Sequence, residues 1–196
     1  MGMYKITAQP QSEPITLAEA KDWLKIHPDV LEDDDLIRGL ISAARNWAEK
    51  GTGRILITQT VVEVWDEWQR CFDLSVGPLN SSTVTFEYRN SAGTYVTLAS
   101  TDYTVDDVSE PGRVMLKNNI SLSTFGGMLS FPNIVKITYN AGKDTALEID
   151  ANIKTAMLLQ IGLMYENRED MPLGKNGNAM ARSAWALLSL SRLNML

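Results

Sequence analysis

Residues 147–170, LEIDANIKTAMLLQIGLMYENRED, decide how the rest of the chain is organised. Apolar side chains recur there at steps of three and four residues, so that one face of a helix stays apolar over several turns. The residues at this spacing are Ile149, Ile153, Met157, Ile161 and Met164, and Leu158, Leu159 and Leu163 widen the apolar face. Because such a helix needs neighbours on most sides, the segment predicts a core helix over residues 148–169, capped at its start by Asp150.

Length, charge and cysteine content limit the class of protein. A chain of 196 residues is long enough to bury a core and forms one domain or two small ones. Its net charge of -6 disfavours a dedicated duplex-DNA binder, which usually presents a basic face. Its apolar runs are shorter than the roughly 18 residues that span a bilayer, and residues 1–11 lack the apolar core of a signal peptide. Cys71 is the single cysteine, so no disulfide within the chain is expected, and the role of this thiol stays open.

The N-terminal region predicts an arm followed by a helix. Residues 1–14 are polar, contain two prolines and predict a flexible N-terminal arm. Thr16 and Glu19 have the spacing of a capping box, in which each residue satisfies a backbone amide near the other. This motif predicts a helix over residues 16–27, which ends before Pro28.

An acidic run, residues 32–35, precedes a second predicted helix over residues 34–51. Four adjacent carboxylates invite a metal-site interpretation. A calcium loop, however, needs oxygen ligands at alternating positions and a sharp glycine turn, and the run has neither. Asp33 or Asp34 as the cap of a helix whose first turn favours negative charge explains the run better.

Between residues 55 and 142 the hydrophobic period changes from three-and-four to two, which indicates strands. The segment TVTFEY at residues 83–88 alternates clearly, and the turn residues that follow it predict a hairpin with residues 95–99. Further strands are expected in the segments ITQTVVEVWDEW, TDYTV, RVMLK and IVKITYN. Residues 118–133 are expected to form a loop.

The predicted fold class is α+β: a helical bundle of about four helices with an inserted antiparallel β segment. Three regions are expected, namely a flexible arm at 1–14, a single domain at 15–170 and a tethered C-terminal helix at 171–196. Residues 171–180 are rich in Gly and Asn and predict a flexible connector to an apolar helix over 181–196. That terminal helix either docks on its own chain or reaches a partner.

Motifs for catalysis, cofactor binding or metal binding are not found in the sequence. The only histidine, His27, lies in a connecting turn, and one cysteine cannot form a His/Cys metal cluster. Nucleophile and dinucleotide-binding motifs are also missing. We therefore expect no catalytic, cofactor or metal residues, and no enzyme. Trp65 and Trp68 leave one alternative open: a carbohydrate- or protein-binding module that uses this Trp-containing β segment, although aromatic side chains also cover the core of a sheet.

The order of segments resembles the head-tail connector, or adaptor, proteins of tailed phages and prophages. The resemblance is carried by PITLAEAKDWLKI, by DDDLIRGLISAARNWAEKGTGRILITQT, by the β segments that end in VKITYNAG, and by IKTAMLLQIGLMYENRED. Together these segments span most of residues 15–170. The resemblance implies a non-enzymatic structural protein of the virion with an α+β fold.

The resemblance also implies a place and partners. Such proteins form a ring, typically of twelve copies, beneath the portal protein at the head-tail junction, after assembly in the cytoplasm of the bacterial host. The ring extends the DNA channel, through which DNA passes without sequence-specific binding, and contacts the next neck or tail completion protein. No membrane is involved. For a partner interface in this chain, we expect Trp185, Leu187 and Leu188 of the terminal helix.

Overall fold

The computed structural model describes residues 2–118, 131–167 and 175–193, and divides the chain into two compact units. Residues Gln11–Ile57 and Lys143–Leu196 form one unit, here called the helical unit. Residues Met1–Pro10 and Thr58–Gly142 form the other, here called the β unit. The α+β class predicted from the sequence is confirmed, while the single domain expected over residues 15–170 stays a prediction.

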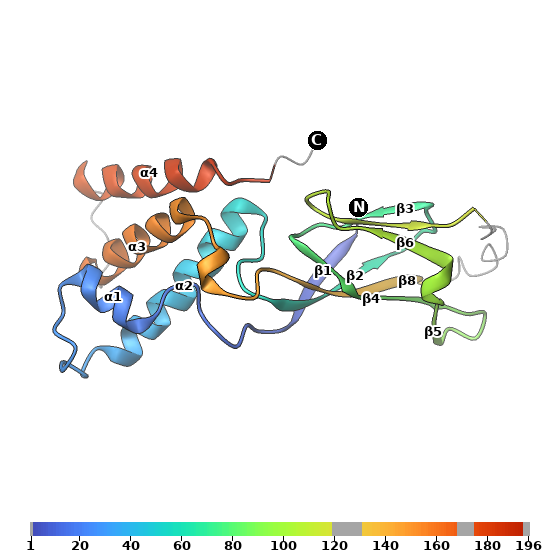
Figure 1. Ribbon diagram of the computed structural model, residues 1–196, viewed down its shortest axis with the longest axis horizontal. Coiled ribbons are helices and arrows are strands. Elements are labelled where there is room, and N and C mark those ends of the chain that lie inside the picture. The colour runs from blue at the N-terminus through green and yellow to red at the C-terminus, as the bar shows by residue number, and fades with distance from the viewer. Residues whose placement is uncertain (1, 119–130, 168–174, 194–196) are drawn as a thin grey trace. The chain divides into compact units, whose positions relative to one another are not determined.

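The described residues of the helical unit form four α-helices, α1 (Leu17–Leu24), α2 (Asp34–Thr52), α3 (Ala151–Glu166) and α4 (Lys175–Ser189), and a short 3-10 helix, Ala146–Glu148 (Figure 1). The predicted capping box begins α1: the Glu19 amide donates to Thr16 Oγ1 (3.2 Å), and the Thr16 amide donates to the Glu19 carboxylate (2.7 Å). Gly53 ends α2 at φ 73°, a left-handed conformation that glycine adopts without steric cost.

The acidic run before α2 is used differently from the prediction. Asp33 occupies the N-cap position, but its side chain makes no cap hydrogen bond. Instead it accepts a hydrogen bond of 2.6 Å from the Tyr165 hydroxyl of α3. Asp34 forms an ion pair with Lys21 of α1. These carboxylates therefore tie three helices together, a contact that local sequence cannot reveal. Asp150 likewise lies at the N-cap of α3 without a side-chain cap bond.

The predicted core helix lies at the centre of the helical unit, as α3. Its buried side chains meet those of α2 and α4 in one apolar cluster. The fully or nearly buried members of that cluster include Ile37, Ile41, Ala44, Ala48, Ile153, Ala156, Met157, Ile161 and Leu188. Small residues on α2 let the helix axes approach closely, while the larger side chains of α3 fill the space between them.

A buried ion network links α2 to the chain segments directly before and after it. Arg45, only 3% exposed, contacts the Glu13 carboxylate through Nε (2.9 Å) and the Glu49 carboxylate through Nη1 (3.2 Å). Glu49 also accepts a hydrogen bond of 3.0 Å from the Leu56 amide. Removal of one partner would leave a buried charge unsatisfied, so the network fixes how the chain enters and leaves this helix.

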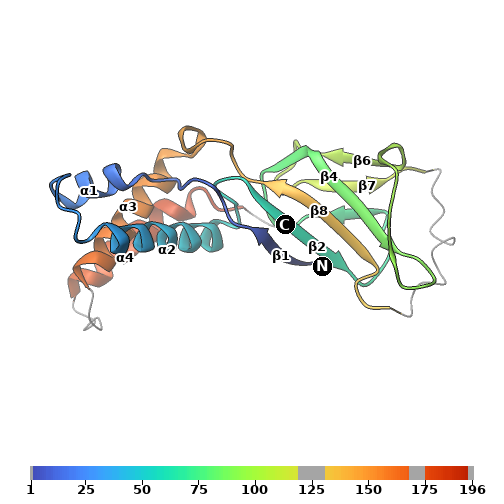
Figure 2. The same cartoon turned by 90° about the horizontal axis from the view of Figure 1, so that it is seen from below.

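The β unit contains two antiparallel sheets. The larger has the order β1-β2-β8-β4-β5, in which β2 and β8 lie side by side along their whole length (Figure 2). The smaller has the order β3-β7-β6. The strands are β1 (Met3–Ala8), β2 (Gln59–Trp65), β3 (Cys71–Asp73), β4 (Leu79–Arg89), β5 (Tyr95–Thr97), β6 (Tyr103–Asp106), β7 (Arg113–Leu116) and β8 (Val135–Ala141).

The expected β segment is present, with two differences at its edges. The hairpin of β4 and β5 forms with the predicted turn, where Asn90 accepts from the amides of Ala92 and Thr94 at 3.0 Å. The expected N-terminal arm is instead the edge strand β1, which pairs with β2 from Met3 opposite Val64. The short strand β3 was also not predicted. Most of the expected loop at 118–133 lies outside the described residues.

Candidate functional site

The C-terminal helix α4, which carries the predicted partner residues, packs within the helical unit on α3 and α2. The expected flexible connector at 171–180 is only partly testable, because residues 171–174 lie outside the described part. Its second half is helical, since α4 begins at Lys175. The connector prediction is therefore wrong for residues 175–180.

A close helix approach fixes α4 against α2. A Cβ atom placed on Gly51 would lie 2.6 Å from Leu188 Cδ2 and 3.1 Å from Trp185 Cζ3. The Trp185 ring meets the Trp47 ring edge to face, with centroids 6.2 Å apart. Such aromatic pairs are worth about 0.5–1.5 kcal/mol beyond the area that they bury. Gly51 is thus the residue that lets α4 approach.

The segment after α4 is anchored by one backbone and one side-chain hydrogen bond. The Leu193 amide donates to the Thr52 carbonyl at 2.8 Å, and Arg54 Nε donates to the Ser191 carbonyl at 2.9 Å. The first bond satisfies a carbonyl at the C-terminal end of α2, where helix carbonyls have no partner in the helix itself, and the second joins the side chain of Arg54 to the turn after α4. The terminal helix is therefore held at both its buried face and its following turn.

The three predicted partner residues differ in how far they are buried. Leu188 is 1% exposed and belongs to the apolar cluster of the helical unit. Leu187 is partly buried against the same cluster. Trp185 is 47% exposed, and Leu190, which was not predicted, is 73% exposed. Of the predicted set, Trp185 is the side chain with the most surface available to another molecule.

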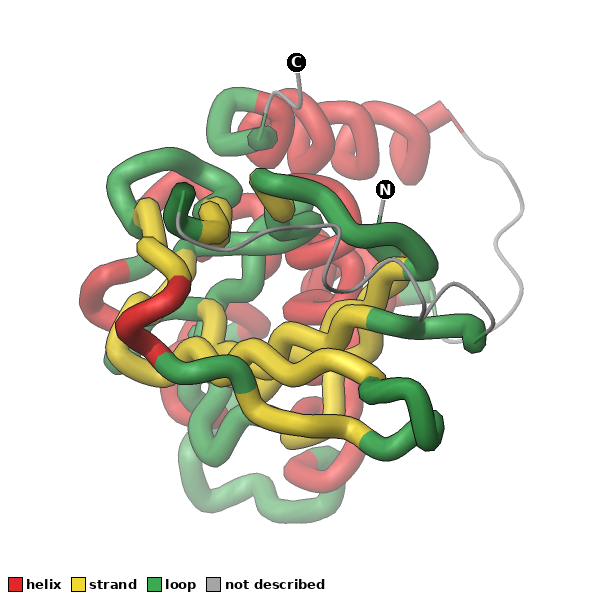
Figure 3. Tube along the Cα trace, turned by 90° about the vertical axis from the view of Figure 1, so that its right-hand side faces the viewer, coloured by secondary structure: helices red, strands yellow, loops and turns green. Residues whose placement is uncertain are grey.

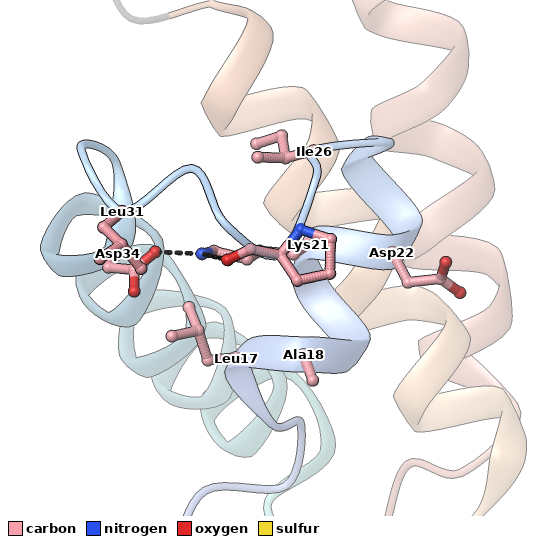
Figure 4. Close-up of a pocket in the computed structure, with 8 residues that line it drawn as sticks. Leu17, Ala18, Lys21, Asp22, Ile26, Leu31 and Asp34 are labelled. Carbon is pink, nitrogen blue, oxygen red and sulfur yellow. Dashed lines mark hydrogen bonds and ion pairs between the residues drawn. The ribbon is translucent and has the colours of Figure 1, made fainter.

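A pocket that the sequence did not predict lies between α1 and the start of α2. It is lined by Leu17, Ala18, Lys21, Asp22, Ile26, Pro28, Leu31 and Asp34, with a volume of about 270 Å³ (Figure 4). Lys21, which is 5% exposed, donates to the carbonyls of Pro28 (3.2 Å) and Val30 (2.7 Å). The sequence contained one signal for this pocket. Lys21 lies four residues after Leu17, on the apolar face of its helix, where a lysine needs a buried partner.

The most deeply buried polar cluster of the β unit has a structural explanation. Glu63 is 0% exposed and accepts hydrogen bonds from the Tyr139 hydroxyl (3.1 Å) and from both the amide and the hydroxyl of Ser75. Burial raises the pKa of Glu63, although these hydrogen bonds counteract part of the effect. Burial also raises the pKa of Tyr139. The cluster joins β2, β8 and the segment after β3.

The tryptophans behind the alternative binding-module hypothesis lie in an aromatic cluster of the β unit. Trp65 is 4% exposed and its ring centroid is 5.2 Å from that of Phe72. Trp68 is half-buried and stacks on Phe86, with centroids 6.0 Å apart. The rings therefore use their faces for packing within the unit, which leaves no open platform for a sugar at Trp65.

The possible metal-binding and reactive groups can be checked among residues 2–118, 131–167 and 175–193. In these ranges no group of three or more His, Cys, Asp or Glu side chains could hold a metal ion. Burial and the nearby Asp73 carboxylate raise the pKa of the Cys71 thiol, which disfavours the reactive thiolate. In the same ranges, no helix combines the length and the apolar character required to cross a membrane.

Comparison with known proteins shows which proteins this chain is similar to. Residues 14–92 match a family model described as phage gp6-like head-tail connector protein. No curated protein matches the sequence. The fold is similar to a chain in the neck of an empty gene transfer agent (GTA) particle computed with C6 symmetry, with a TM-score of 0.72 and 19% identity. This similarity covers 99% of the present chain and 97% of the other.

Two further solved structures give the same result. A chain of the virion of a native gene transfer agent particle has a TM-score of 0.71 at 19% identity, and one of the neck of a native GTA particle computed with C12 symmetry has 0.69 at 20%. Each similarity covers 99% of this chain and 97% of the other. The family match confirms, for residues 14–92, the resemblance of this sequence to the head-tail connector proteins of tailed phages, a family of structural proteins and not of enzymes. The solved structures show that the fold is shared.

Proposed function

We propose that this chain is a head-tail connector that forms a ring beneath the portal protein of a tailed-phage particle, joins the head to the tail and extends the DNA channel. The observation that carries the proposal is the similarity of the whole fold, over 99% of the chain, to a chain from a particle neck, together with the family match over residues 14–92.

The number of copies in the proposed ring is twelve. The support is the C12 symmetry of one similar neck structure and the C6 symmetry of another, since a twelve-fold ring is compatible with both. A ring of identical chains needs two different, mutually complementary surfaces on each copy. In this proposal the helical unit acts as a four-helix bundle and the β unit as its insertion.

The proposed neighbours are the portal protein, the next neck or tail completion protein, and DNA in the lumen. The net charge of -6 supports passage of DNA without tight binding, because a protein that neutralises many phosphates would retain the DNA. The protein would act in the virion at the head-tail junction, after assembly in the cytoplasm of the bacterial host. Trp185, exposed on α4, remains our candidate for a contact with a partner.

Light-scattering mass of the purified protein, alone and mixed with the portal protein from the same phage genome, tests this function. A ring of twelve has a mass of about 260 kDa, twelve times the 21.8 kDa of one chain. We expect that mass for the free ring, or that mass added to the portal if assembly is templated. A chain that stays monomeric and ignores the portal across a range of salt concentrations would contradict the proposal.

A further inference from the structure

One surface of the helical unit has the features of a protein-binding contact and is here called the α4 face. It comprises Arg182 and Trp185 of α4 and Leu190 in the turn directly after it, all of them exposed. Trp185 is held on one side by the Trp47 ring, so little side-chain freedom remains to be lost on binding. Residues 181–193 contain two arginines and no acidic residue. The α4 face is therefore an apolar projection with positive charge beside it.

A second surface, here called the α1–α2 pocket, has the opposite character. Its apolar wall includes Leu31, which is 69% exposed at the mouth. Residues 29–35 contain five carboxylates and no basic residue. Asp34 pairs with Lys21 and Asp35 with Arg38, which leaves the segment with an excess of negative charge, and the side chains of Asp29 and Asp35 are 91% and 99% exposed. A volume of about 270 Å³ is below the roughly 300–1,000 Å³ of small-molecule sites, which suits one large side chain better than a cofactor.

The two surfaces lie on opposite sides of the helical unit. Figure 1 shows α4 at the top of that unit and the connection between α1 and α2 at the bottom, with α3 between them; Figure 3, turned by 90°, again shows α4 at the top. One copy cannot bring its own two surfaces together. Two copies related by a two-fold axis cannot form both contacts between an α4 face and an α1–α2 pocket at once, because the two surfaces of each copy face in opposite directions. A contact between these surfaces therefore continues from copy to copy.

We propose that the α4 face of one copy docks in the α1–α2 pocket of the next, with Trp185 directed at the apolar wall and Arg182 at the acidic rim. The inference rests on the proposed ring function and assigns the surfaces that build the ring. A rigid aromatic side chain in a pocket, beside an arginine, is the usual composition of an interface hot spot. The opposite charges on the two surfaces orient the approach and disfavour contact between like surfaces.

Two variants, each with one altered surface, test this docking. The pocket variant is Leu31→Asp and the α4-face variant is Arg182→Glu with Leu190→Asp; all three side chains are exposed, so the fold is expected to survive. Leu147→Asp is the matched control, because Leu147 is 90% exposed in the helical unit and belongs to neither surface. Circular dichroism and the unfolding midpoint confirm that each variant is folded.

Light-scattering mass gives the result. Either surface variant alone should weaken self-association by about tenfold or more, or leave fewer chains on the portal than the wild type does. A mixture of the two should give a dimer of about 44 kDa, twice the mass of one chain, because each variant keeps one intact surface and growth stops after one contact. The Leu147→Asp control should assemble normally.

The outcomes separate this inference from the function on which it rests. If the wild type and both surface variants form the same ring, the docking surfaces are wrong while the ring function stands. If the two variants do not pair when mixed, or lose only portal binding, the docking proposal is also overturned. If the wild type neither assembles nor joins the portal, the proposed function fails and this inference with it.

Discussion

At the scale of single residues, Gly51 matters because of what lies opposite to it. Side-chain atoms of Leu188 and Trp185 occupy the space that a Cβ would need, and Leu188 is buried. Alanine would favour the α2 helix by about 1 kcal/mol, but overpacking of a buried contact costs about 1–3 kcal/mol. Which effect is larger depends on whether the side chain opposite Gly51 can move. Leu188 is buried and has little room to move, so the cost of overpacking is the larger effect.

We therefore expect Gly51→Ala to lower the free energy of unfolding, and Gly39→Ala to raise it by about 1 kcal/mol. Gly39 lies in the same helix, and a Cβ there would meet no atom within 4 Å. Urea unfolding of both variants measures the difference. Equal stabilisation by the two alanines would show that α4 does not approach α2 as closely as described.

Glu63 is the second residue with a measurable consequence. Burial raises its pKa in the folded β unit above the ordinary value of 4.5. The folded protein then holds the proton more tightly than the unfolded chain, so the contribution to stability is fully present below about pH 4.5 and is lost as pH rises through the folded pKa.

Glu63→Gln removes this titration while keeping the shape of the side chain. From about pH 4.5 upward, the wild-type unfolding temperature should fall relative to that of Glu63→Gln. Thermal unfolding at a series of pH values tests this, with the exposed Glu67→Gln as control. Parallel curves for the wild type and Glu63→Gln would contradict a raised pKa at this position.

At the scale of elements, α4 combines a buried face with an exposed one. Leu188 lies in the apolar cluster, whereas Trp185 of the same helix is 47% exposed and Leu190, in the turn directly after the helix, is 73% exposed. A helix docked on its own unit should respond to changes on its buried face as a core element does, and tolerate changes on its outer face.

Leu188→Ala should reduce the free energy of unfolding by about 2–5 kcal/mol, as buried leucines do, while Leu190→Ala should change it by less than about 0.5 kcal/mol. Chemical unfolding of the full chain gives both values. If Leu188→Ala left stability unchanged and instead abolished portal binding, α4 would be a free partner helix as the alternative sequence interpretation has it.

The elements with strong local patterns were predictable. The capping box at Thr16, the apolar stripe of α3 and the alternation of β4 each follow from the sequence alone. The edge strand β1 was missed because its residues are exposed and its stability comes from pairing with β2, more than fifty residues away. The strand propensity of a residue reports only its local preference, whereas an edge strand such as β1 depends on a distant partner.

The candidate surfaces were predictable only in part. Trp185 was predicted as a partner contact because an apolar terminal helix indicates one, and that contact stays a prediction. The sequence could not show which side chains of this helix are buried, as Leu188 is. The α1–α2 pocket was missed because its acidic rim was assigned to helix capping. The carboxylates of Asp33 and Asp34 instead contact α3 and α1, which depends on how three helices meet.

At the scale of the whole molecule, two compact units come from one chain that leaves the helical unit and returns to it. The helical unit carries both proposed docking surfaces, and the β unit has its own core around Phe72, Phe86 and Tyr139. A structural protein needs surfaces and stable cores rather than a reactive cleft, and this division meets that requirement.

The central claim is that this chain builds a ring on the portal, and electron micrographs of the purified protein mixed with the portal protein test it most directly. We predict averaged images in which a ring of twelve copies lies on the axis of the portal and continues its channel. Images of a bare portal at saturating concentrations of the chain, or of chains bound singly on its periphery, would contradict the account.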